Sequence, residues 1–132
     1  MPIEQLKPIR LSEIDMDEAY VYGGHFLAYR TITYGVIHRE TGTIALVEDL
    51  SGDVKEVGLF NFRRSLNDGG KWLANGTIML IKEPYLTEEK AMLGNSYIRV
   101  DSPSDVIFID ETDLKSLESV GAQKWYAFRA IL

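Results

Sequence analysis

Cysteine is absent from the 132-residue sequence, and histidine occurs only at His25 and His38. Without cysteine the chain has no disulfide, no thiolate metal ligand and no thiol nucleophile. Two isolated histidines are more often structural or solvated than metal-bound, so we expect no metal and no cofactor. Small secreted domains usually depend on disulfides, so the absence of cysteine favours an intracellular location, in the cytoplasm or nucleus.

Long hydrophobic runs are missing as well. The first ten residues lack the apolar stretch of a signal peptide, and no run approaches the roughly 20 apolar residues of a membrane span. We therefore expect no membrane partner.

Positive charge is scarce. The chain has 14 Lys and Arg against 20 Asp and Glu, for a net charge of −6. This balance disfavours general attraction to phosphate backbones and acidic membranes. The densest basic spot is Arg63-Arg64, extended by Lys71. By contrast, 45% of the residues are hydrophobic, which is enough to form the core of one globular domain.

Extended segments dominate the first half of the chain. Residues 20–33 are rich in aromatic and β-branched side chains, and we expect one long strand that kinks at Gly23-Gly24. Thr43–Asp49 and Val54–Phe60 flank the turn residues Ser51-Gly52-Asp53. Two apolar runs around such a turn predict a β-hairpin.

The second half continues with shorter segments. A short helix ending near Asn67 precedes predicted strands at residues 77–82 and 96–100, and Pro84 indicates a bend or an edge. Residues 87–95 are expected to form a charged loop. A last strand is predicted at residues 106–109, followed by a helix with Asp110 as its N-cap and Gly121 as its end.

This order predicts an all-β fold with one or two short helices, arranged as a five-stranded Greek-key barrel of the OB type. A split β-barrel of another topology is the alternative. The expected organisation is an N-terminal arm at 1–19, the OB-like barrel at 20–110, and a C-terminal helix and apolar tail at 111–132. The tail is apolar and lacks a helix cap, which predicts that the chain leads into a further domain.

Several short stretches carry a resemblance to a known family. They are Leu46-Val47-Glu48-Asp49, Gly52-Asp53-Val54, Leu59-Phe60-Asn61, Glu83-Pro84-Tyr85 and residues 98–106. On these stretches, residues 18–110 resemble the N-terminal module that precedes tetratricopeptide repeats and a SET domain in a group of fungal proteins. The resemblance implies one module of a larger multidomain protein. Any lysine methyltransferase chemistry would belong to the SET region, so no catalytic residue carries over.

Aromatic and basic side chains near the predicted barrel face are the candidate binding residues. Proteins that bind single strands on OB barrels stack bases on such rings and hold the backbone with Lys or Arg. The alternative is that the rings fill the barrel core and its ends, including Tyr29 and Tyr34. The candidates are Arg39, Lys55, Phe62, Arg63, Tyr85, Tyr97 and Arg99.

Two short acidic motifs each have a chemical interpretation, as a metal or catalytic site, and a structural one, as a turn. Asp49, Gly52 and Asp53 resemble part of a metal loop, but acids in a hairpin turn commonly bind their own backbone, which we favour. Ser102-Pro103-Ser104-Asp105 contains hydroxyl groups, but no histidine lies nearby in sequence to act as a base. A turn is again the favoured interpretation, and we expect no catalytic residue.

The sequence therefore predicts a non-catalytic module that binds a protein partner. The alternative is single-stranded nucleic-acid binding through the OB face. A late apolar cluster, Trp125, Tyr126 and Phe128, offers a second contact surface. It either covers an open end of the barrel or begins a helix that packs on a following domain or on a second copy of the chain.

Overall fold

β-Strands dominate the computed structural model, which describes residues 5–14, 20–33, 36–38, 42–62, 73, 75–90 and 96–126. One short α-helix, α1 (Leu114–Ser119), follows the strands, and short 3-10 helices occur at η2 (Leu11–Glu13), η3 (Pro103–Asp105) and η4 (Gln123–Trp125). The strands are β1 (Lys7–Ile9), β2 (Tyr20–Val21), β3 (His25–Thr31), β4 (Val36–His38), β5 (Gly42–Asp49), β6 (Val54–Phe60), β7 (Ile78–Lys82), β8 (Tyr85–Lys90), β9 (Ser96–Val100) and β10 (Val106–Ile109).

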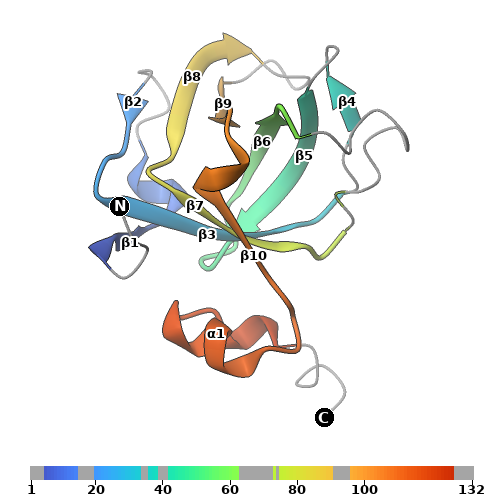
Figure 1. Ribbon diagram of the computed structural model, residues 1–132. Helices are drawn as coiled ribbons and strands as arrows, with labels where there is room; N and C mark the ends of the chain where they lie inside the picture. The colour runs from blue at the N-terminus through green and yellow to red at the C-terminus, as the bar shows by residue number, and fades with distance from the viewer. Residues whose placement is uncertain are drawn as a thin grey trace.

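The strands form one mixed sheet. Its main path runs β10-β7-β3-β5-β6-β9-β8-β2, with β1 paired to β3 and β4 paired to β5 (Figure 1). Most pairs are antiparallel, but β6 pairs with β9 in parallel, and so does β1 with β3. The all-β prediction with a short helix is confirmed at this level. The sheet has more and shorter strands than the five expected.

Among the described residues, hydrogen bonds do not close the sheet into a barrel. β7 pairs with β3 and β10, whereas β8 pairs with β9 and β2. Only Glu83 and Pro84 separate β7 from β8, and Glu83 has a φ of +48°. Proline has no N–H to donate to a ladder, and a left-handed residue before it turns the chain. The bend expected at Pro84 therefore divides one extended segment into two strands with different neighbours.

The predicted hairpin is confirmed as β5 and β6, with Glu48 opposite Val54 across the turn. Gly52 adopts a φ of +89°, which glycine tolerates and most residues do not.

Three local predictions need correction. Gly23-Gly24 does not kink one strand: a turn there ends β2 and begins β3, and Gly24 has a φ of +77°. Residues 87–90 belong to β8 rather than to a loop, because pairing with β9 stabilises even this charged segment. The N-cap of α1 is Asp113 and not Asp110. The predicted helix near Asn67 falls mostly outside the described residues.

Two separate apolar layers lie on the two sides of the sheet. The interior layer contains Tyr29, Val57, Leu59 and Ile98, all fully buried, together with Leu11 from the N-terminal arm. Burial raises the pKa of Tyr29, whose hydroxyl lies 3.8 Å from the sulfur of Met79. Alternate residues of each strand supply this layer, as the period of a β-strand requires.

The opposite side of β3 and β7 is covered by the C-terminal segment. Leu117 of α1, Ala122 and Trp125 pack on Phe26 and Leu80 of these strands. Figure 1 shows β10 leading from the sheet to α1, which lies beneath it. The described part of the C-terminal segment, up to residue 126, is thus a layer of the fold, and this contact explains its apolar side chains.

Candidate binding surface

Tyr85 and Arg99 are the two predicted site residues that the structure brings together. They lie opposite each other in the β8–β9 pair, so they share one face of the sheet. Both residues are half-buried. This face is directed away from the interior layer, because Ile98 and Val100, the neighbours of Arg99 in sequence, belong to that layer.

The other predicted residues lie elsewhere or do not present an exposed surface. Tyr97 shares the face of Arg99 but is fully buried. Phe62 belongs to the interior layer. Lys55 lies on the same face of β6 as Val57 and Leu59 of the interior layer, and so on the opposite side of the sheet from Arg99. The last two predicted residues, Arg39 and Arg63, fall outside the described residues.

A small apolar cluster lies next to Arg99 on the same side of the sheet. It consists of Ile44, Phe60 and Tyr97, and the ring centroids of Phe60 and Tyr97 are 6.3 Å apart. Gly58 allows this packing: a Cβ there would lie 2.8 Å from a side-chain atom of each cluster residue. Because contacts that short are not tolerated, glycine is required for the cluster to close around β6.

Arg99 is held in place by two neighbours. Its guanidinium carbon lies 4.0 Å from the centroid of the Phe60 ring, and its Nε donates to Asp101 Oδ1 at 2.8 Å. Partial burial lowers the pKa of Arg99, but the hydrogen bond and charge of Asp101 and the nearby Tyr97 raise it above its usual value. The guanidinium is therefore a fixed positive charge.

A pocket of about 390 Å³ opens beside these two residues, and we refer to it as the Tyr85 pocket. It lies where β7 bends into β8, against the end of β9 and the start of β10. Its charged lining residues are Lys82, Glu83, Arg99, Asp101 and Asp105. The carboxylates outnumber the cations by one, so the pocket favours a polar or cationic group over a phosphate.

A second pocket, of about 570 Å³, lies between the N-terminal arm and the end of α1. Leu6, Phe26, Leu50 and Val120 make it largely apolar, and Arg10 lies at its border. The guanidinium of Arg10 donates to Ser51 Oγ at 3.2 Å. The pocket therefore lies where the arm, the hairpin turn and the C-terminal segment meet.

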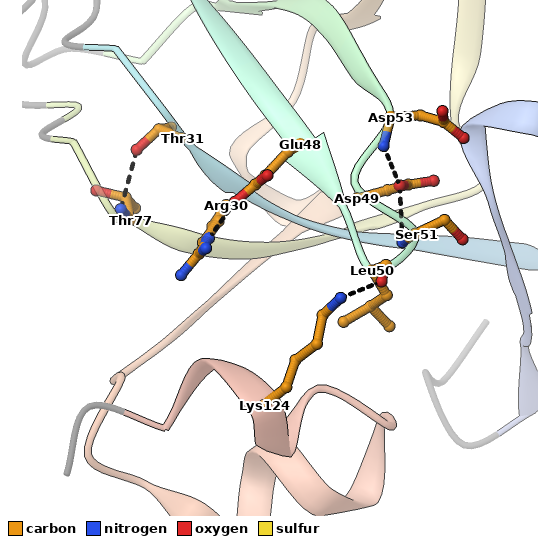
Figure 2. Close-up of polar contacts among 9 residues, drawn as sticks. All are labelled: Arg30, Thr31, Glu48, Asp49, Leu50, Ser51, Asp53, Thr77 and Lys124. Carbon is orange, nitrogen blue, oxygen red and sulfur yellow. Dashed lines mark hydrogen bonds and ion pairs between the residues drawn. The ribbon is translucent and has the colours of Figure 1, made fainter. Parts of the chain in front are cut away.

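In the acidic hairpin turn, the carboxylate of Asp49 binds the backbone of the fold. The carboxylate of Asp49 accepts hydrogen bonds from the N–H groups of Ser51 and Asp53, at 2.9 and 3.1 Å, and from that of Leu11 at 2.8 Å. Figure 2 shows the first two bonds. Both carboxylate oxygens are thus used by the backbone. Within the described ranges, no group of three His, Cys, Asp or Glu side chains is arranged to hold a metal ion.

The remaining candidate catalytic side chains also make hydrogen bonds to residues near them in sequence. His25 Nδ1 lies 3.0 Å from the carbonyl oxygen of Gly23. Ser102 Oγ caps η3 by accepting from the N–H of Ser104. The side chain of His38 is not among those described. Among the described residues, neither the serine segment nor His25 forms a nucleophile–base pair.

The sequence matches no protein-family model and no curated protein. In the part of the chain that the structure describes, no helix has the length and apolar character needed to cross a membrane.

Sequence reasoning missed most of the Tyr85 pocket. The predicted binding residues do not include Lys82, Glu83, Asp101 or Asp105, although a bend or an edge was predicted at Pro84. The available signal was the pair of charged residues, Lys82 and Glu83, directly before the predicted bend at Pro84. What was missing was the pairing of β8 with β9, which brings residues 82–85 next to residues 99–101.

Proposed function

We propose that this chain is a non-catalytic OB-type module that binds a protein partner through the Tyr85 pocket. The observation that carries the proposal is the composition of that pocket. An aromatic ring and a fixed guanidinium lie beside a small excess of carboxylate groups. Aromatic and arginine side chains at a concave, half-buried site are typical anchors of protein interfaces.

The order of the strands supports the OB assignment. From β3 the ladder runs through β5 and β6 to β9 and then to β8, and the chain continuing from β7 into β8 returns it to β3. If β7 and β8 count as one strand bent at Glu83 and Pro84, five long strands complete the circuit. This corresponds to a partly open Greek-key barrel. At one corner the chain itself, rather than strand pairing, connects β7 to β8.

Nucleic-acid binding is the rival function. It needs exposed rings for stacking bases, and Phe62 and Tyr97 are buried. The half-buried Tyr85 and the cations Lys82 and Arg99 favour it, but Glu83, Asp101 and Asp105 line the same pocket and repel phosphate. The protein partner is therefore the better supported candidate.

The resemblance to the module that precedes repeats and a SET domain supports the same proposal. In such an arrangement a barrel without catalytic groups acts by binding, and the chemistry belongs to another domain. We accordingly propose an intracellular module of a larger protein.

An affinity capture experiment tests the proposed function. The whole chain is immobilised as bait in an extract of its source cells, and recovered protein and nucleic acid are both quantified. The test variant combines Tyr85→Ala with Asp105→Lys, and Glu118→Lys on exposed α1 is the matched control. We expect a defined protein to be recovered with the original and control chains and at least about tenfold less with the pocket variant.

Two outcomes would contradict the proposal. One is recovery of nucleic acid alone, with affinity that falls steeply as salt increases. The other is recovery of the same protein at an equal level by the pocket variant, with a thermal melt showing that this variant is folded.

A further inference from the structure

The second pocket, of about 570 Å³, is built by segments that lie far apart in the sequence. Its volume falls in the range of about 300–1,000 Å³ that is usual for small-molecule sites. The N-terminal arm, β3 with the hairpin turn, and the end of α1 each contribute one side of it. We refer to it as the arm pocket, and its lining residues include Leu6, Pro8, Arg10, Phe26, Leu50 and Val120.

Strand pairing directs the side chains of the arm toward this pocket. β1 pairs in parallel with β3, and the backbone remains extended at Arg10. Ile9 belongs to the interior layer, so its neighbours Pro8 and Arg10 face the other side of the sheet, where the pocket lies. Leu6 and Leu50 are buried in the layer formed with the C-terminal segment. Among the described lining residues, Arg10 is the only one with a charged side chain.

The guanidinium of Arg10 has hydrogen-bonding capacity left for a ligand. A guanidinium carries five N–H donors, and the described residues give this one a single partner, the neutral hydroxyl of Ser51, at 3.2 Å. No carboxylate among those residues forms an ion pair with it. Glu13, three residues away, instead accepts from the backbone N–H of Arg10 at 2.9 Å. The remaining donors can therefore bind an incoming carboxylate, in the bidentate arrangement that this pair favours.

The lining selects the chemistry of the ligand. Apolar walls favour an alkyl chain over a sugar or a nucleotide, because polar groups would lose water there without gaining partners. A single guanidinium at the border favours one carboxylate head, which it matches in shape as well as in charge. A peptide that ends in a carboxylate also brings backbone N–H and C=O groups, which apolar side chains leave unsatisfied. The features together favour a small molecule.

We propose that the arm pocket binds a small amphipathic carboxylate, with its alkyl chain against Leu50 and Val120 and its head on Arg10. The arm pocket shares no described lining residue with the Tyr85 pocket, so this inference goes beyond the proposed function and does not depend on it. The bound chain contacts the arm, the hairpin turn and the end of α1 together. Because such a ligand binds the folded chain alone, it should raise the temperature of unfolding.

Binding of sodium octanoate to the whole chain tests the inference. Calorimetry measures the affinity, and NMR shifts of the Leu50 and Val120 methyl groups locate the ligand. We expect saturable binding, a higher melting temperature, and an affinity that increases about three- to fourfold for each methylene from pentanoate to octanoate. Octylammonium has the same chain and the opposite charge, and it should bind at least about fivefold more weakly. This result would run against the net charge of −6, which by itself attracts the cation.

Matched variants test the role of Arg10. Arg10→Gln removes the cation of the pocket, and Lys7→Gln removes an exposed cation of the same arm that does not line it. We expect the first to weaken octanoate binding by about three- to tenfold and the second to leave it unchanged. Val120→Trp fills the pocket and should weaken the binding of octanoate and octylammonium alike. A thermal melt shows that each variant is folded.

Three outcomes would overturn the inference. The first is the absence of saturation by octanoate in the millimolar range. The second is an equal effect of Arg10→Gln and Lys7→Gln on its affinity. The third is tighter binding of acetyl-Leu-Leu with a free carboxyl group than of octanoate, which would assign the pocket to the end of a peptide chain.

Discussion

The carboxylate of Asp49 shows how one residue can connect distant parts of this chain. It is 1% exposed and accepts from the N–H groups of the hairpin turn and of Leu11, 38 residues earlier in the chain. A buried donor that loses its acceptor costs the full desolvation penalty, about 1–3 kcal/mol for each group. Asp49 therefore stabilises both the turn and the docking of the N-terminal arm.

Replacing Asp49 with alanine tests this role. We expect Asp49→Ala to lower the free energy of unfolding by roughly 2–4 kcal/mol, because three backbone donors lose their acceptor. Ser51→Ala keeps the backbone N–H that Asp49 binds, and it should change stability by no more than about 0.5 kcal/mol. Urea unfolding followed by circular dichroism measures both. Equal stability of the two variants would show that the carboxylate is not needed.

At the scale of the element, α1 depends on its N-terminal cap. Asp113 accepts from the hydroxyl of Ser116 at 2.7 Å and from its N–H at 3.1 Å. These two bonds lower the pKa of Asp113, and the neighbouring charge of Asp110 opposes them only in part. A group whose pKa is lowered by folding stabilises the fold at neutral pH and loses that effect as pH falls through the lowered pKa.

An acid titration of α1 follows from this. We expect the NMR chemical shift of the Ser116 amide to change as the pH is lowered, with a midpoint below the usual aspartate pKa of about 3.9. α1 should remain capped at pH 5 and loosen only below about pH 4. Asp113→Asn should remove this titration, while Glu111→Gln should leave it in place. A midpoint at or above the usual value would contradict the cap.

Two hydrogen bonds of Glu83 explain the bend between β7 and β8, again at the scale of the element. Glu83 donates its backbone N–H to the carbonyl of His25, and its side-chain oxygen accepts from the N–H of Gly24. These bonds hold the corner against the start of β3. The corner directs Tyr85 toward Arg99 and so forms one wall of the Tyr85 pocket.

At the scale of the whole molecule, the C-terminal segment joins the sheet to the hairpin turn. Lys124 Nζ donates to the carbonyl of Leu50, as Figure 2 shows. Arg30 lies 5.5 Å from the centroid of the Trp125 ring and forms an ion pair with Glu48. The arm, the sheet and the C-terminal segment therefore share contacts, which favours cooperative unfolding.

Removing the Trp125 ring tests this coupling. We expect Trp125→Ala to lower the free energy of unfolding by about 3 kcal/mol, because the side chain is buried against Phe26 and Leu80. Unfolding should stay a single transition. Lys115→Ala, on the exposed side of α1, is the control and should change stability by about 0.5 kcal/mol or less. A separate early transition would instead show that the C-terminal segment unfolds on its own, and it would contradict the coupling.

Local sequence signals determined most of the strands of this protein. Two apolar runs around the Ser51-Gly52-Asp53 turn predicted β5 and β6 almost to the residue, because hairpins depend on interactions between neighbours in the chain. The turn residues Ser102-Pro103 delimited the start of β10 in the same way. The acids of the turn were also interpreted correctly, since Asp49 binds its own hairpin backbone.

Only the tertiary structure decided which of the predicted binding residues lie together. Strand pairing is non-local: the sequence predicted a charged loop at residues 87–95, but pairing with β9 makes residues 87–90 part of β8. The same pairing places Tyr85 opposite Arg99. Burial is likewise a property of the assembled layers, so Tyr97 and Phe62, which are aromatic like Tyr85, are buried while Tyr85 stays half-exposed. Sequence determines which side chains are available, but the pairing of distant strands determines which of them meet.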